Sequence, residues 1–223
     1  MGYDWDFSFL APYTGAFIRG TWVTLVISFA SFFIGTLVGI PMGMIIRIKH
    51  LKGALLPLND LIRAIPVLVL IFMVYYFPFR DFFGIPNPSA ILSGIIAIAI
   101  SQAAYTADLV RAAVDGVSPR IFNGGRALGL KERTIWRTLI LPDIFRQVLP
   151  AEVAFFLGII RISNLCAVIG APDVVFVARI ATSQSFRSLE AWVLVALIYA
   201  VLILPITALT RCLEKSEWLK RRW

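Results

Sequence analysis

Histidine and cysteine are scarce in the 223-residue chain, which has one histidine, His50, and two cysteines, Cys166 and Cys212. A metal site or a Ser-His-Asp triad would have to be built around His50, which stands in the polar run RIKHLK. One cysteine lies in an apolar stretch and the other beside a basic tail, so we do not expect them to bridge. Neither a metal site nor a catalytic triad is predicted.

Charged residues are also few, at 15% against about 25% in typical soluble domains, while hydrophobic residues reach 59%. The mean hydropathy is +0.84. A chain of this size cannot hide so much apolar surface in one core, so its surroundings are expected to be lipid. The first cation is Arg19, which excludes a cleavable signal peptide and predicts that the first apolar stretch is retained.

The short alternating strands of a membrane barrel are missing, but five apolar runs are long enough to cross a bilayer core of about 30 Å. We expect helices because a segment in lipid must satisfy its own backbone hydrogen bonds. The chain 1–223 is predicted to be one all-α transmembrane domain, with Pro66 and Pro205 as kink positions and with spans at about 21–46, 54–79, 88–110, 150–170 and 192–209.

The cations are distributed unevenly between the two sides of these spans. Four lie in 47–63, seven in 111–146 and five in 211–223, against four on the other side and Arg161 within a span. The positive-inside rule therefore predicts the N-terminus outside and the C-terminus in the cytoplasm. Topology explains the net charge of +8, so no nucleic-acid partner is expected. The segment 111–149 is then cytoplasmic, and 80–87 and 171–187 are short outer loops.

The most specific pattern lies in the segment 120–150, RIFNGGRALGLKERTIWRTLILPDIFRQVLP. A helical piece over 126–128 is predicted to break at Gly129, because glycine permits a sharp change of direction. Helix is expected to resume over 131–141, before Pro142. The result would be a short helix on the membrane surface, a turn and a helix leading inward, which suits a groove in a cytoplasmic partner.

This spacing resembles the EAA loop of ABC importer permeases: E-A-A, three residues, Gly, nine residues, Ile, one residue, Leu-Pro. Gly129, Leu141 and Pro142 fall in register, and Leu139 takes the Ile position. Three further segments resemble the polar amino-acid subfamily (His/Glu/Gln/Arg/opine type), namely RAIPVLVLIFMVYYF at 63–77, AYTADLVRAAVDGV at 104–117 and NLCAVIG at 164–170. The likeness runs from about residue 21 to residue 211.

The resemblance implies a type I ABC importer permease fold in a bacterial inner membrane. It implies a translocation subunit of an ATP-driven, binding-protein-dependent importer for a polar amino acid or related compound. The implied partners are two cytoplasmic ABC ATPase subunits, a second permease copy or a homologous permease, an extracytoplasmic substrate-binding protein and membrane lipid. The implied ATPase-coupling residues are Asn123, Gly124, Gly125, Arg126, Ala127, Leu128 and Gly129.

The chain has no phosphate-binding GxxxxGK[ST] motif, so it is not itself the ATPase and no enzyme activity is predicted. ATP and Mg would be bound by the partner, and no cofactor is expected here. The family's E-A-A triplet is replaced by Asn123-Gly124-Gly125. Asparagine offers only neutral hydrogen bonds to the ATPase, which would cost about 1 kcal/mol of coupling energy. This departure slightly favours a heterodimer, although a homodimer remains open.

Arg161 lies eleven residues beyond Pro150, which puts it about 16 Å along a helix and near mid-membrane. A charge at that depth is costly and by default marks a function. Either its planar guanidinium binds the α-carboxylate of an amino-acid substrate, or it forms an ion pair with Glu152 or Asp108. The family's K-D-T-S motif corresponds to residues 161–164 of this chain. Arg161 keeps the cation of the motif, whereas Ile162 replaces its acid.

The other candidates for a substrate path are Asp108, Tyr105, Gln102 and Asn164. Asp108 is either a partner for a substrate ammonium or, as we favour, a helix-end charge at the interface. Tyr105 and Gln102 either line a path or form ordinary interhelical hydrogen bonds.

Two alternative functions find no support in the sequence. An ATP-independent transporter or channel would need inverted repeats or a gating element, and the sequence shows neither. A membrane anchor or assembly subunit would have no use for Arg161 in mid-membrane.

Overall fold

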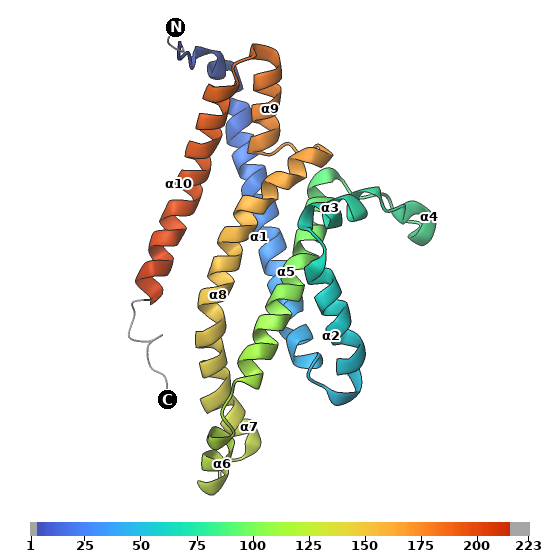
Figure 1. Ribbon diagram of the computed structural model, residues 1–223, viewed down its shortest axis with the longest axis vertical. Coiled ribbons are helices and arrows are strands. Elements are labelled where there is room, and N and C mark those ends of the chain that lie inside the picture. Colours follow the sequence, from blue (N-terminus) through green and yellow to red (C-terminus); the bar gives the residue numbers. More distant parts are fainter. Residues whose placement is uncertain (1–3, 215–223) are drawn as a thin grey trace.

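The computed structural model describes residues 4–214, and within that range every regular element is helical. Figure 1 shows an elongated bundle in which the long helices run along the long axis. The all-α prediction is confirmed for these residues. The elements are a 3-10 helix η1 Ser8–Tyr13, α1 Thr14–Ile45, α2 Lys49–Ala64, α3 Val67–Tyr76, α4 Phe79–Phe83, α5 Ala90–Asp115, α6 Pro119–Ala127, α7 Glu132–Ile135, a π-helical segment η2 Trp136–Ile140, α8 Leu141–Ile162, a 3-10 segment η3 Ser163–Ile169, α9 Val174–Ser185 and α10 Ser188–Glu214.

Four helical runs are long and apolar enough to cross a membrane, namely Ser8–Ile45, Ala90–Asp115, Glu132–Ile169 and Ser188–Arg211. The predicted span 54–79 is not one helix, because α2 and α3 meet at a bend of 100°. Ile65 is extended, with ψ at 125°, since a residue before proline avoids the helical conformation. The kink expected at Pro66 is therefore a complete break, and five spans result only if this bent pair counts as one.

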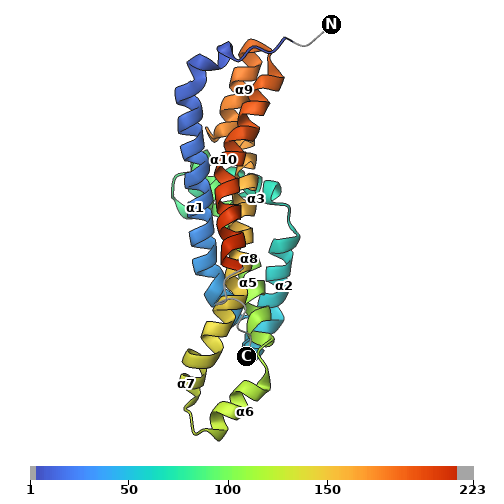
Figure 2. The ribbon, with the colours of Figure 1, turned by 90° about the vertical axis from the view of Figure 1, so that its left-hand side faces the viewer.

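The region 171–187 is not the short loop that we expected, because it contains the helix α9. Asp173 caps this helix, and its Oδ1 accepts a hydrogen bond from the backbone N–H of Phe176 at 2.8 Å. The helix packs against α1 where Gly20 lacks a side chain, since a Cβ there would lie 2.9 Å from the carbonyl carbon of Asp173. Figure 2 shows α9 beside α1 and α10 at the end of the bundle nearest the N-terminus.

The helix expected to end before Pro142 instead continues through it. The run from Glu132 to Ile162 is helical throughout, but its turn over Trp136–Ile140 is π-helical. A proline has no N–H to donate to the carbonyl four residues earlier and its ring crowds that carbonyl, so the wider turn accommodates Pro142 without ending the helix. The predicted entry point at Pro150 is likewise internal to α8.

The tightest packing in the bundle is between α1 and α5. Three glycines of α1, at positions 35, 39 and 43, face α5 at helical spacing of four residues. A Cβ on Gly39 would lie 2.6 Å from the carbonyl oxygen of Ala103, and one on Gly43 would lie 2.5 Å from that of Ala107. Small residues at this spacing let two membrane helices approach until their backbones touch.

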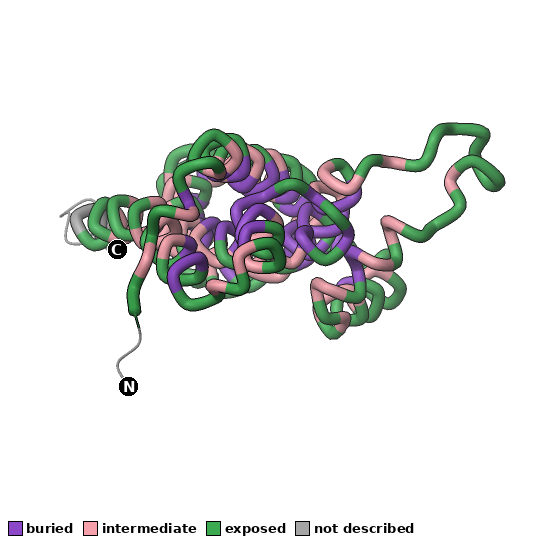
Figure 3. The backbone as a smooth tube through the Cα atoms, turned by 90° about the horizontal axis from the view of Figure 1, so that it is seen from above, coloured by how far each residue is buried: buried purple, intermediate pink, exposed green. Residues whose placement is uncertain are grey.

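The buried residues form a central column, coloured purple in Figure 3, where α1, α3, α5 and α8 meet. Ile27, Ile71, Ile98 and Ile159 are the most buried large side chains of this core and are at most 3% exposed. The segment that carries α4 extends away from the column, and most of its residues from 77 to 89 are exposed. The α4 segment therefore takes no part in the core.

Replacing Gly39 with alanine should destabilise the bundle, because the new methyl group would lie 2.6 Å from a backbone oxygen that cannot move alone. We expect the free energy of unfolding to fall by about 1–3 kcal/mol, as for other overpacked sites. The thermal midpoint of the detergent-purified protein measures this change. Gly53→Ala is the matched control, since nothing lies within 4 Å of a Cβ at Gly53. Equal midpoints for the two variants would contradict the close approach.

Candidate functional site

A pocket of about 280 Å³ lies between α3, α5 and α8 within the bundle. The wall from α5 is polar, with the side chains of Ser101, Gln102 and Tyr105, whereas the wall from α8 is apolar or small. The structure thus brings together two of the predicted path residues, Gln102 and Tyr105. Asp108 and Asn164 do not line this pocket, and Asn164 lies in the 3-10 segment that follows α8.

Arg161 does not line the pocket, but it lies at the edge of the face of α8 that does. It follows Ala154 by seven residues and Gly158 by three, and both of these are lining residues. Residues at these spacings share one side of a helix. Arg161 is exposed and is the penultimate residue of α8, where the helix dipole favours a positive charge. The guanidinium therefore belongs to the rim of the pocket rather than to the packed core.

Glu152 is the most buried acid of α8, at 5% exposure, and it joins three helices. Its Oε1 accepts a hydrogen bond from the hydroxyl of Thr106 at 2.7 Å. Its Oε2 accepts from the hydroxyl of Thr36 at 2.9 Å and from the amide of Gln102 at 3.2 Å. Three neutral donors from α1 and α5 therefore hold this carboxylate beside the pocket.

Asp108 belongs to a separate cluster of charges where α2 meets α5. One of its oxygens lies 2.9 Å from a guanidinium nitrogen of Arg63, and the other accepts a hydrogen bond from Arg111. The Arg63 guanidinium also lies over the ring of Tyr105, 5.3 Å from its centroid. The cluster thus touches the pocket through Tyr105, and both carboxylate oxygens of Asp108 are occupied.

The ion pair considered from the sequence for Arg161 does not form. In the described part of the chain, Glu152 is held by hydroxyl and amide donors and Asp108 by Arg63 and Arg111. The Glu152 hydrogen bonds were not predicted, because sequence reasoning treated Glu152 only as a possible partner of Arg161. An acid two residues after Pro150 in an apolar run was the available signal, but its donors come from helices far away in the sequence.

The segment with the predicted coupling residues forms a compact two-helix projection at the end of the bundle farthest from the N-terminus, as Figure 2 shows. Ser118 caps α6 by accepting a hydrogen bond from the N–H of Arg120, and Pro119 begins the helix. The helix is longer than the predicted piece 126–128 and ends at Ala127. The chain turns at Gly129, the predicted break, whose φ of 72° is left-handed. The N–H of Leu130 closes the turn on the carbonyl of Gly125 at 3.0 Å.

The projection is tightly packed on its inner side and exposed on its outer side. The missing side chain of Gly125 lets α6 approach α7, since a Cβ there would lie 2.7 Å from Ile135. Leu128 at the tip is 79% exposed, so its side chain is accessible to a partner. Asn123, at the position of the family glutamate, lines a depression of about 300 Å³ together with Arg47 and Trp136.

Replacing Glu152 with leucine should lower stability, because it strands the hydroxyls of Thr36 and Thr106 and the amide of Gln102. A buried donor without an acceptor costs about 1–3 kcal/mol. The thermal midpoint of the purified protein should fall, and adding Thr106→Val should restore part of the loss. Glu132→Leu, at an exposed acid, is the control. A higher midpoint for Glu152→Leu would mean that the hydrogen bonds do not stabilise the fold.

Comparison with known proteins identifies the family to which a chain with this fold, pocket and projection belongs. Residues 35–218 match the family model described as "Binding-protein-dependent transport system inner membrane component". The chain is 31% identical over 202 residues to the probable amino-acid ABC transporter permease protein YckA of Bacillus subtilis, covering 89% of this chain and 88% of YckA. It is 27% identical to the arginine transport system permease protein ArtQ of the same organism, covering 95% and 96%.

A solved structure gives the same result for the fold. The crystal structure of an amino acid ABC transporter with histidines contains a chain that is 30% identical to this one. The two superpose with a TM-score of 0.84, over 96% of this chain and 99% of the other. The chain therefore belongs to the family of inner-membrane components of binding-protein-dependent transport systems, the permease subunits of ABC importers.

Proposed function

We propose that this chain is the translocation subunit of an ATP-driven importer for a polar amino acid or a related compound. The observation that carries the proposal is the pocket between α3, α5 and α8, with the amide of Gln102 on its wall and Arg161 on its rim. The printed names of the relatives support the substrate class, since they refer to amino-acid transport and, for ArtQ, to arginine transport.

In this proposal the Arg161 guanidinium binds the α-carboxylate of the substrate. A planar fork of donors matches a carboxylate, and the rim position leaves these donors accessible. Glu152 does not contact the substrate in this scheme, because all its described donors come from the protein itself. It instead positions Gln102, whose side chain forms part of the pocket wall.

The end of the bundle with α6 and α7 faces the cytoplasm in the proposed orientation, and the N-terminus lies outside. The distribution of cations supports this, because the connection from α1 to α2, which carries Arg47 and Lys49, and the segment 111–146 with α6 and α7 are at or near that end, while α9, which carries Arg179, is at the other (Figure 1). Lys215, Lys220, Arg221 and Arg222, which we also counted from the sequence, lie outside the described residues.

The α6–α7 projection docks into a groove of a cytoplasmic ATPase in this scheme, with Leu128 as its apolar contact. Two such ATPase subunits serve a pair of permeases, made of two copies or of this chain and a homologous permease. Each permease receives substrate from an extracytoplasmic binding protein. Asn123 replaces the charged contact of the family with a neutral one, so the proposed docking depends more on shape and apolar contact.

The coupling role predicts the effect of Gly129→Pro. Proline fixes φ near −65°, whereas Gly129 has a φ of 72°, so the turn between α6 and α7 cannot form. We expect normal membrane insertion but at least a tenfold loss of substrate-stimulated ATPase activity in the complex. Gly84→Pro is the matched control, because Gly84 also has a left-handed φ, of 68°, but lies beside α4. Retained stimulation in Gly129→Pro would exclude this turn as the coupling element.

The substrate role of Arg161 is tested with the complex of permease, ATPase and binding protein in proteoliposomes, using radiolabelled L-amino acids and beginning with L-arginine. Arg161→Lys keeps the charge but loses the two-pronged geometry, so the apparent affinity for uptake should fall by about tenfold or more. Arg161→Met should reduce uptake further. Basal ATPase activity should stay near normal in both variants.

The yield of assembled complex separates this role from a purely structural one. Good yield of Arg161→Met with little uptake supports a substrate site, and Arg80→Met on the exposed helix α4 is the control that should transport normally. A poor yield for Arg161→Met would mean that the guanidinium stabilises the assembly instead. Failure of the wild-type chain to co-purify with an ATPase would refute the importer proposal as a whole.

A further inference from the structure

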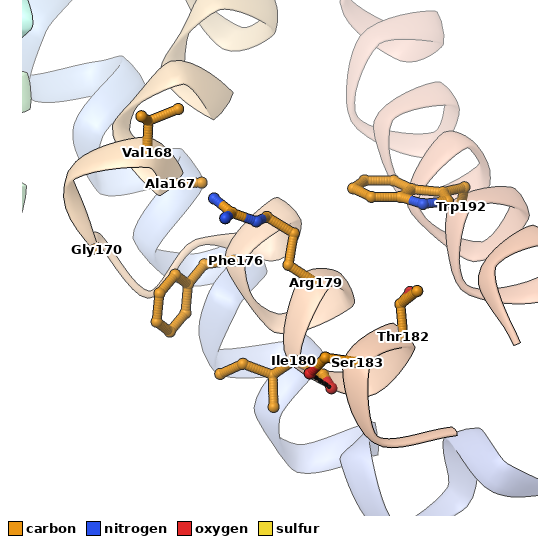
Figure 4. Close-up of a pocket in the computed structure, with 9 residues that line it drawn as sticks. All are labelled: Ala167, Val168, Gly170, Phe176, Arg179, Ile180, Thr182, Ser183 and Trp192. Atoms are coloured by element: carbon orange, nitrogen blue, oxygen red, sulfur yellow. Dashed lines mark hydrogen bonds between the residues drawn. The ribbon is translucent and has the colours of Figure 1, made fainter. Parts of the chain in front are cut away.

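A second pocket, of about 480 Å³, lies at the end of the bundle opposite α6 and α7, between the 3-10 segment Ser163–Ile169, α9 and α10. Figure 4 shows the Arg179 side chain extending from α9 across this pocket toward Val168, with the indole of Trp192 on the facing helix α10. Val168, Ile180 and Trp192 are 52%, 38% and 41% exposed, so the apolar walls are open to the surroundings. The pocket therefore combines apolar walls with one cation.

No residue in the lining of the pocket carries a negative charge that would balance Arg179. None of the ion pairs found among the described residues involves Arg179. The nearby hydroxyl of Ser183 donates to the carbonyl of Ile180 at 2.8 Å and so is already used. A ligand for this pocket must bring an anionic group together with apolar surface.

The depth of the pocket indicates which ligand meets both requirements. Trp192 is the second residue of the charge-free part of α10, residues 191–210, which covers about 30 Å at 1.5 Å per residue. That length nearly matches the hydrocarbon core, so Trp192 lies at its edge, where tryptophan is enriched. The guanidinium of Arg179 faces it across the pocket and is therefore at the level of the lipid headgroups.

We propose that this pocket binds an anionic phospholipid, with the Arg179 guanidinium on the headgroup phosphate and the beginning of an acyl chain against Val168, Ile180 and Trp192. A free amino acid fits less well because its ammonium group would find no carboxylate in the lining. A free phosphate would leave the apolar walls uncovered. An amphiphile satisfies both parts of the pocket.

Such a lipid would stabilise the position of α10, which has little support from protein. Only 6% of the most apolar window of α10 is buried, compared with 67% for α5. A lipid seated between α9 and α10 would add contacts at the beginning of α10, beside its buried residues Ala191 and Val195, where the helix is held to the bundle. The site is independent of the substrate pocket between α3, α5 and α8, with which it shares no lining residue.

The test uses the full chain purified in detergent and titrated with dioleoylphosphatidylglycerol, with bound lipid counted by native mass spectrometry. Arg179→Gln should weaken binding about fivefold, the change expected when one cation near the headgroup is lost. Arg19→Gln is the matched control, because Arg19 is also an exposed arginine near the same end and has Trp22 beside it, but it lies outside this pocket. Its binding should equal that of the wild type.

Two further measurements identify the ligand and distinguish a loss of binding from misfolding. Ile180→Asp leaves Arg179 in place but puts an acid in the pocket, so it should weaken binding as much as Arg179→Gln. Excess inorganic phosphate and excess L-arginine should not displace the lipid. Displacement by phosphate would make this a free-anion site, and displacement by L-arginine would make it a carboxylate site. Either result, or equal losses for Arg179→Gln and Arg19→Gln, would overturn the proposal.

Discussion

The close approach of α1 to α5 is the constraint on which the rest of the bundle depends. Gly35 and Gly39 face Gln102 and Thr106, and a Cβ on either glycine would lie 2.6 Å from the Cβ of its neighbour. The same two α5 side chains donate to Glu152 of α8. A carboxylate inside a membrane bundle is tolerated only when its oxygens are hydrogen-bonded. The glycines therefore make room for the donors, and the donors permit the acid that joins the third helix.

This arrangement separates two kinds of polar group inside the protein. Glu152 is held by neutral donors near the pocket, whereas Asp108 is held by arginines where α2 meets α5. Gln102 belongs to both the Glu152 hydrogen bonds and the pocket wall, so its amide is oriented before any ligand arrives. A preorganised amide loses little freedom on binding, which would favour selective recognition of the polar substrate that we propose.

The helical run from Glu132 to Ile162 provides a mechanical connection between the projection and the pocket. It begins beside Gly129, passes Pro142 through a π-helical turn, and then carries Ala154 and Gly158 to the pocket and Arg161 to its rim. A continuous helix transmits a displacement along its axis because its backbone hydrogen bonds resist stretching. In the proposed coupling, a movement of α6 and α7 would reach the pocket wall along this helix, and the π-helical turn is its one irregular segment.

The sequence by itself determined the membrane class, the apolar runs, the turn at Gly129 and the resemblance to importer permeases, because composition and local backbone preference decide each of these. It indicated Pro66 and Arg161 as special positions for the same reason. Only the tertiary structure decided that Pro66 breaks the helix by 100°, that 174–185 is a helix packed on α1, and that Glu152 is buried whereas Arg161 is exposed. These features depend on which residues of helices far apart in the sequence come into contact. The spacing of residues within one helix does not predict which hydrogen-bond donors another helix places beside it.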